Sequence, residues 1–108
     1  MTLHKYELHH WTEKGTIKYR PMSGFEEKPK IYLRATGMPQ KVKKDDIGRV
    51  VTDGFAYQLI LTGRDDEKAI QMIKNAIQND INEKEREWQQ KKARLERKRQ
   101  TLKVEDMT

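Results

Sequence analysis

The N-terminal part of the chain alternates apolar with polar positions, which is the period of a β-strand with one buried face. Five segments show this pattern: 3–12, 16–20, 30–36, 47–52 and 55–62. The Asp53-Gly54 step between the last two is a strong hairpin signal, because both central residues of a type I′ turn need positive φ. Pro21 is expected to end the second strand, with an ordered loop over 21–29. The pattern therefore predicts a small antiparallel sheet of four to five strands within residues 1–63, with 55–62 as its central strand.

After Gly63 the apolar period changes from two residues to three and four, the spacing of an amphipathic helix. Asp65 or Asp66 can cap its N-terminus. The apolar stripe consists of Ala69, Ile70, Ile73, Ala76, Ile77 and Ile81. No glycine or proline interrupts residues 64–108, so one long helix is expected over 65–103. A helix of more than thirty residues is roughly 50 Å long, so its distal half should project beyond the sheet from about residue 84. The predicted fold is a single α+β domain over residues 1–108, with the sheet packed against one long C-terminal helix.

Positive charge is concentrated in that distal segment. The net charge is +6, and residues 84–103 contain nine basic residues against three acidic ones, which leaves 14 of each sign elsewhere in the chain. Only 34% of the residues are hydrophobic and 37% are charged, so part of the chain must be solvated on most sides. The distal helix is therefore the basic part of an otherwise formally neutral protein.

The sequence offers little that could support catalysis or a cofactor. Cysteine is absent, and Ser23, the only serine, lies outside any nucleophile motif. His4, His9 and His10 suggest a metal site, but on a strand only His4 and His10 share a face, about 20 Å apart. Three acidic pairs lie in predicted turns or at a helix start: Glu26-Glu27, Asp45-Asp46 and Asp65-Asp66. We therefore expect no enzyme activity, no cofactor, no metal and no small-molecule substrate.

No secretory signal and no apolar run long enough to span a bilayer is present in the sequence. No membrane association is expected. The predicted location is the cytoplasm.

Large apolar residues recur at every seventh position of the distal helix. They are Ile81, Trp88, Leu95 and Leu102. The companion heptad positions are charged, so this stripe forms half of a coiled-coil seam. An indole in a projecting helix favours packing over exposure to water. The stripe predicts self-association as a homodimer or docking to a host protein.

Nucleic-acid binding is the alternative function for the same helix. The basic residues that would neutralise phosphates are Lys91, Lys92, Arg94, Arg97, Lys98 and Arg99. Side chains expected from the sheet could extend that surface: Trp11, Arg20, Tyr32 and Arg34. A solvated charged helix explains the same pattern without a ligand, because Glu87 with Lys91 and Lys92 with Glu96 are spaced for i,i+4 ion pairs.

The layout of the chain resembles small uncharacterised proteins of phages and prophages of Gram-positive bacteria. The resemblance rests on the strand Ile31-Tyr32-Leu33-Arg34, the step Lys43-Lys44-Asp45-Asp46-Ile47-Gly48 and the charged helix after the last hairpin. Proteins of that kind include anti-CRISPR inhibitors and other host-takeover factors. The resemblance implies a non-catalytic accessory binding protein that acts in the host cytoplasm. It assigns no functional site residues to this chain.

Overall fold

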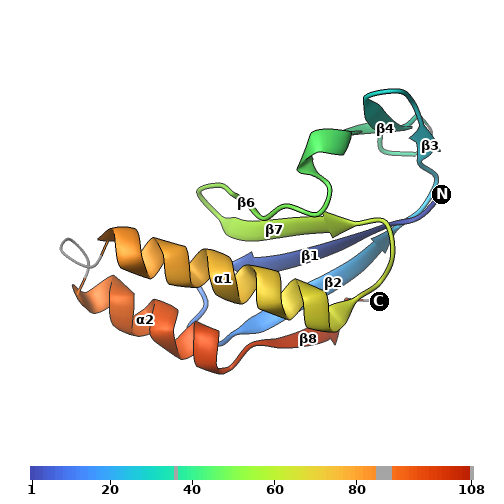
Figure 1. Cartoon of the computed structure of the whole chain (residues 1–108). Coiled ribbons are helices and arrows are strands. Elements are labelled where there is room, and N and C mark those ends of the chain that lie inside the picture. Colours follow the sequence, from blue (N-terminus) through green and yellow to red (C-terminus); the bar gives the residue numbers. More distant parts are fainter. Residues whose placement is uncertain (36, 85–88, 108) are drawn as a thin grey trace.

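Two sheets and two α-helices make up the part of the chain that the computed structural model describes, which is residues 1–35, 37–84 and 89–107 (Figure 1). The larger sheet has the strand order β6-β7-β1-β2-β8. Its strands are β1 (Leu3–His9), β2 (Thr16–Met22), β6 (Val51–Thr52), β7 (Ala56–Leu61) and β8 (Lys103–Asp106). The α+β class predicted from the sequence is confirmed, but the arrangement differs from the prediction at several points.

The centre of the larger sheet is β1, which pairs antiparallel with β2 and β7. The side chains that these three strands turn toward the helices are buried: Tyr6, Leu8, Ile17, Tyr19, Tyr57, Leu59 and Leu61. The expectation that residues 55–62 form the central strand is wrong, since β7 lies between β1 and the short β6. Phe55, expected on the buried face, is 73% exposed in the turn before β7.

The hairpin predicted at Asp53-Gly54 is confirmed, because β6 and β7 pair antiparallel on either side of it. Its turn type is different from the expected one, since neither Asp53 nor Gly54 has a positive φ. The Asp53 carboxylate instead accepts hydrogen bonds from the N–H groups of Phe55 (2.7 Å) and Ala56 (2.9 Å). An aspartate side chain that bonds the backbone two residues on closes the turn without positive φ.

Pro21 lies inside β2, although it was expected to end the strand. The Tyr19 carbonyl accepts a hydrogen bond from the Met107 N–H on the β8 side (3.0 Å). Backbone groups alternate between the two sides of a strand, so the Pro21 nitrogen faces that same side. β8 ends at Asp106, so its pairing with β2 stops at Tyr19 and needs no N–H from Pro21. The strand therefore continues past the proline.

The prediction of one projecting helix over 65–103 is wrong. The segment contains α1 (Asp66–Lys84) and α2 (Gln89–Gln100), which lie side by side on one face of the larger sheet, followed by β8 (Figure 1). β8 pairs in parallel with β2, so the sheet is not wholly antiparallel. The reason is burial: Leu95 of α2 joins Ile77 and Ile81 of α1 in a single core under the sheet. Such packing removes apolar surface that a projecting helix would leave in water.

The start of α1 follows the sequence prediction. The Asp65 carboxylate accepts a hydrogen bond from the Lys68 N–H (3.0 Å), which is an N-cap contact. The predicted apolar stripe faces the sheet, with Ala69, Ile73, Ile77 and Ile81 buried and Ile70 and Ala76 partly buried. Within the described residues, no helix is long and apolar enough to cross a membrane.

A second sheet of three strands occupies a region where the sequence predicted an ordered loop over 21–29 and a strand over 30–36, and β4 confirms that strand. Its strands are β3 (Glu26–Glu27), β4 (Ile31–Arg34) and β5 (Gln40–Lys43), followed by the 3₁₀ turn η1 (Lys44–Asp46). A separate core joins it to the larger sheet through Leu3, Met22, Phe25, Tyr32 and Val42, with Ile47 and Ile60 packed against them. The prediction of a single sheet is therefore wrong. The smaller sheet covers only the Leu3 end of the face turned away from the helices.

Candidate functional site

The apolar stripe expected to bind a partner is part of the protein's own core where the structure describes it. Ile81 is 5% exposed and Leu95 is 8% exposed. Leu102 packs against the same core. Trp88 lies outside the described residues. The spacing of Ile81, Leu95 and Leu102 is therefore explained by their packing in the core of the larger sheet.

Several basic residues of α2 are engaged within the molecule. Arg97 forms an ion pair with Glu13 (3.3 Å). The Arg99 guanidinium donates a hydrogen bond to Gln78 of α1. Lys92 is half-buried and Arg94 is exposed, whereas the Lys91 side chain lies outside the described part of the structure. The six residues proposed from the sequence therefore do not act together as one free basic surface.

Lys98 is the clearest case, since its side chain is 0% exposed. Its ammonium group donates to the carbonyl oxygens of His9 and His10, both at 2.6 Å. Burial, with a smaller contribution from the nearby Arg94 charge, lowers the pKa of Lys98 to about 8. Lys98 thus fastens α2 to the end of β1 and is unavailable to phosphate.

The sheet residues suggested as additions divide into two groups. The Arg34 guanidinium stacks on Phe25 and donates to the Met38 carbonyl (3.0 Å), and Tyr32 is buried in the second core. These two have structural contacts. Arg20 is exposed on β2 and Trp11 is 68% exposed beyond the end of β1, so both are accessible to a ligand.

An exposed polar face lies on the side of the larger sheet opposite the helices. Side chains alternate along each strand, so the residues between the buried ones point to this side. They pair across neighbouring strands, Lys5 with Arg20 and Glu7 with Lys18 in register. We call this surface the open face and define it by Lys5, Glu7, His9, Lys18, Arg20 and Glu105.

Acidic residues of the open face are matched by neighbours on the same face. Glu7 contacts Lys5 (3.4 Å) and His9 Nε2 (2.8 Å). Glu105 forms an ion pair with Lys18 (2.8 Å), and the pKa of the Glu105 carboxyl is lowered mainly by this hydrogen bond. The negative charge of these two carboxylates is therefore locally compensated, and Arg20 is left as a net positive charge.

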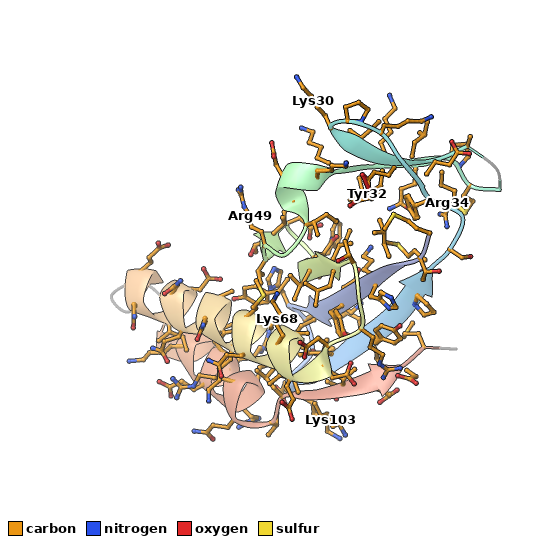
Figure 2. All side chains as sticks on the ribbon, turned by 45° about the vertical axis from the view of Figure 1, so that its right-hand side comes forward. Lys30, Tyr32, Arg34, Arg49, Lys68 and Lys103 are labelled. Atoms are coloured by element: carbon orange, nitrogen blue, oxygen red, sulfur yellow. The ribbon has the colours of Figure 1, made fainter. Side chains whose placement is uncertain are left out.

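A groove of about 280 Å³ continues the open face where the two sheets meet. We call it the inter-sheet groove. Ile60 and Val51 of the larger sheet line it together with Val42 of β5. Its charged residues are Lys41, Lys43, Asp46 and Arg49. Figure 2 shows Arg49 projecting from the segment between the three-stranded sheet and β6.

Four cations around these two surfaces have no partner among the residues that the structure describes. Within residues 1–35, 37–84 and 89–107, no ion pair involves Arg20, Lys41, Lys43 or Arg49. All four are exposed. Asp46 is the one acidic side chain among the groove residues named above. The groove and the adjoining open face therefore carry net positive charge that the protein itself does not neutralise.

The three histidines do not converge. His4 Nδ1 hydrogen-bonds the Tyr19 hydroxyl (2.7 Å), whereas His9 contacts Glu7 and the His10 Nε2–H donates to the Asp53 carbonyl (2.9 Å). Among the side chains that the structure describes, no group of three or more His, Asp or Glu residues is placed to hold a metal ion.

Comparison with known proteins returned no matching family, no matching curated protein and no matching solved structure.

Proposed function

We propose that this protein is a non-catalytic binder of single-stranded nucleic acid, held on the open face and in the inter-sheet groove. The observation that carries the proposal is that four exposed cations, none of them in an ion pair with a described residue, lie around one groove and the adjoining open face: Arg20, Lys41, Lys43 and Arg49. Basic side chains that neutralise phosphates release condensed counterions, and this release drives binding. Cations already paired with carboxylates, such as Lys18, contribute less.

Trp11 supplies a second feature expected of a single-strand site. Its ring packs on His9 at the edge of the open face (centroids 5.2 Å apart), while most of its surface stays in water. Unstacked bases bind to exposed aromatic rings without requiring a particular sequence, and a strand face with nearby cations follows the backbone. This combination favours a single strand over a duplex, whose bases are already stacked.

Direct binding measurements test the proposal. Fluorescence anisotropy should detect binding of labelled single-stranded DNA and RNA at about 50 mM salt. Oligonucleotides of about 16 nucleotides are suitable, because this is the largest length that one small single-strand-binding domain typically covers. Four phosphate contacts predict a slope of about −2.8 for log affinity against log salt. A matched duplex should bind more weakly. Failure to bind either single strand at that salt concentration would overturn the proposal.

Neutralising the groove should weaken binding far more than neutralising the helices. In Lys43→Ala/Arg49→Ala, the loss of two phosphate contacts should reduce the salt slope by about 1.4 and lower affinity at about 0.1 M salt roughly 25-fold. The matched control is Lys74→Ala/Arg97→Ala, which also removes one lysine and one arginine, both exposed on the helices. Anisotropy titrations of both variants over a salt series provide the comparison.

The control should retain close to wild-type affinity, since it breaks only the exposed Arg97–Glu13 pair. Equal losses in the two variants would point to net charge rather than a site. A larger loss of affinity in the control would instead indicate that the nucleic acid binds to the helices, as the sequence pattern predicts.

Binding of a host protein or self-association through α2 stays a prediction, and so does the phage-type accessory or anti-CRISPR-like role. The burial of Ile81 and Leu95 leaves those side chains unavailable to a partner in this fold. The groove is therefore our preferred site. The absence of enzyme activity also stays a prediction.

A further inference from the structure

A pocket of about 560 Å³ opens at the far end of the larger sheet, away from the three-stranded sheet. It lies where the turns after β1 and before β7 meet the C-terminal half of α1 and the middle of α2. We call it the end pocket and define it by His10, Tyr57, Asp80, Glu83, Arg94 and Leu95. Small-molecule sites typically occupy about 300 to 1,000 Å³ and combine apolar walls with a few polar groups. The end pocket has that size and composition.

One wall of the pocket is aromatic and fixed in place. The ring of His10 packs edge-on against Tyr57, with centroids 4.7 Å apart. The His10 Nε2–H donates to the Asp53 carbonyl (2.9 Å), which holds the imidazole in this orientation. Leu95 adds an apolar side chain from α2. Tyr57 and Leu95 are nearly buried, so the surfaces that can cover the apolar portion of a ligand are His10 and Trp11, which also lines the pocket.

Two carboxylates form the charged part of the pocket. Asp80 and Glu83 lie in the last two turns of α1, which ends at Lys84. The C-terminus of a helix carries partial negative charge, so acids there are unfavourable and a bound cation is favourable. Neither carboxylate forms an ion pair within the described part of the chain. In this basic protein, the pocket therefore brings together two carboxylates that form no ion pair with a described residue.

Tyr57 positions one of those carboxylates. Its hydroxyl donates to Asp80 Oδ2 at 2.5 Å. Burial, followed by this hydrogen bond, raises the pKa of Tyr57 well above its usual value, so the phenol remains a donor at neutral pH. Asp80 Oδ1 accepts no hydrogen bond from any described residue and can receive one from a ligand. The third carboxylate nearby, Asp53, already accepts hydrogen bonds from the Phe55 and Ala56 N–H groups and from the Gln58 side chain.

We propose that the end pocket binds a small organic cation. Its ammonium or guanidinium group lies between Asp80 and Glu83, and its apolar portion packs on His10 and on Trp11, which also lines the pocket and is 68% exposed. Arg94 adds a positive charge from α2, which disfavours a second cationic end and favours a carboxylate there. The preferred ligand class is therefore an amino-acid-like molecule with one cationic and one anionic end.

Calorimetric titration at low ionic strength with N-acetylarginine and with agmatine tests this proposal. Both carry a guanidinium group, but agmatine ends in an amine instead of a carboxylate. N-acetylarginine should bind the wild type more tightly than agmatine. In Arg94→Ala this preference should be lost, because the guanidinium that favours the carboxylate of N-acetylarginine over the amine of agmatine is gone. Absence of heat or saturation with both compounds at about 10 mM would overturn the proposal, since even millimolar affinity would then be measurable.

Removal of the pocket's negative charge provides the second arm. Asp80→Asn/Glu83→Gln keeps an acceptor for the Tyr57 hydroxyl and should lower the affinity for N-acetylarginine at least about tenfold, as expected for loss of a charge-assisted hydrogen bond. Glu67→Gln is a control for the loss of a single charge, because Glu67 is an exposed acid in the first turn of the same helix. The control should bind like the wild type. Unchanged affinity in the double variant, with the fold intact by circular dichroism, would exclude the proposed site.

The Asp80→Asn/Glu83→Gln variant keeps Trp11 and every cation of the open face and the inter-sheet groove, so single-strand binding should not be weakened in it. The two proposals can therefore fail separately.

Discussion

Replacing Gly15 by alanine is expected to destabilise the fold by about 3 kcal/mol or more, at the upper end of what overpacking costs. An alanine Cβ at this position would lie 2.2 Å from the Lys98 carbonyl oxygen and 2.8 Å from the Leu102 nitrogen. Both are backbone atoms, so no side-chain rotation can relieve the contact. The Gly15 carbonyl also accepts a hydrogen bond from the Lys103 N–H (2.8 Å). The substitution should therefore push α2 and β8 away from the turn that joins β1 and β2.

Gly63→Ala is the matched control for this prediction. No atom lies within 4 Å of a Cβ built at Gly63, and its φ is not positive. Its effect should stay within about 0.5 kcal/mol, or be slightly stabilising through the unfolded chain. Urea unfolding followed by far-ultraviolet circular dichroism gives both values. Similar unfolding midpoints for the two variants would contradict the close approach at Gly15.

The elements that the sequence predicted correctly have strong local signals. The Asp53 turn lies between two alternating runs, and the Asp65 cap precedes an apolar stripe at helical spacing. In each case the residues that determine the structure lie within a few positions of one another. The α+β class, the last hairpin and the buried face of α1 could be predicted for this reason.

The elements that were missed bury very few side chains. β5 and β8 each turn one hydrophobic residue inward, Val42 and Val104, and are otherwise charged or polar. A period of two cannot be recognised from one apolar residue. The partner of β8 is β2, more than eighty residues away, so its pairing depends on packing that no local pattern encodes. The return of α2 alongside α1 was missed because its apolar positions, spaced by seven, also fit one continuous helix.

The candidate site was missed for a related reason. Lys41 and Lys43 belong to a run that looked like a polar connection, and only the second sheet brings them beside Arg49. The sequence does suggest Arg20 and Trp11 as contributions from the sheet, and both are accessible in the structure. Net charge indicated α2 instead, because a charge count does not reveal which cations are used internally. Lys98 is such a cation.

Lys98→Ala should destabilise the protein by about 3 kcal/mol near pH 7. The substitution leaves the His10 carbonyl without its donor, while the His9 carbonyl keeps only the Thr12 hydroxyl (3.0 Å), and it opens a cavity in place of a buried aliphatic chain. Relief of the desolvation cost of the ammonium offsets part of this loss. Arg97→Ala, on the adjacent exposed position, removes only a surface ion pair and should cost less than about 0.5 kcal/mol. Urea unfolding of both variants gives the comparison.

The effect of Lys98→Ala should also depend on pH. Because burial lowers the pKa of Lys98 from 10.5 to about 8, the folded protein binds fewer protons than the unfolded chain between these values. The contribution of Lys98 to the free energy of unfolding therefore rises by about 2 kcal/mol as the pH increases across this window. This contribution is lost as the pH falls through 8. Above pH 10 stability should decline in both proteins, since burial and the Asp66 hydrogen bond raise the pKa of Tyr6 to about 12. The destabilisation by Lys98→Ala should consequently be larger at pH 10 than at pH 7, and parallel pH profiles for the two proteins would show that Lys98 is not desolvated in the fold.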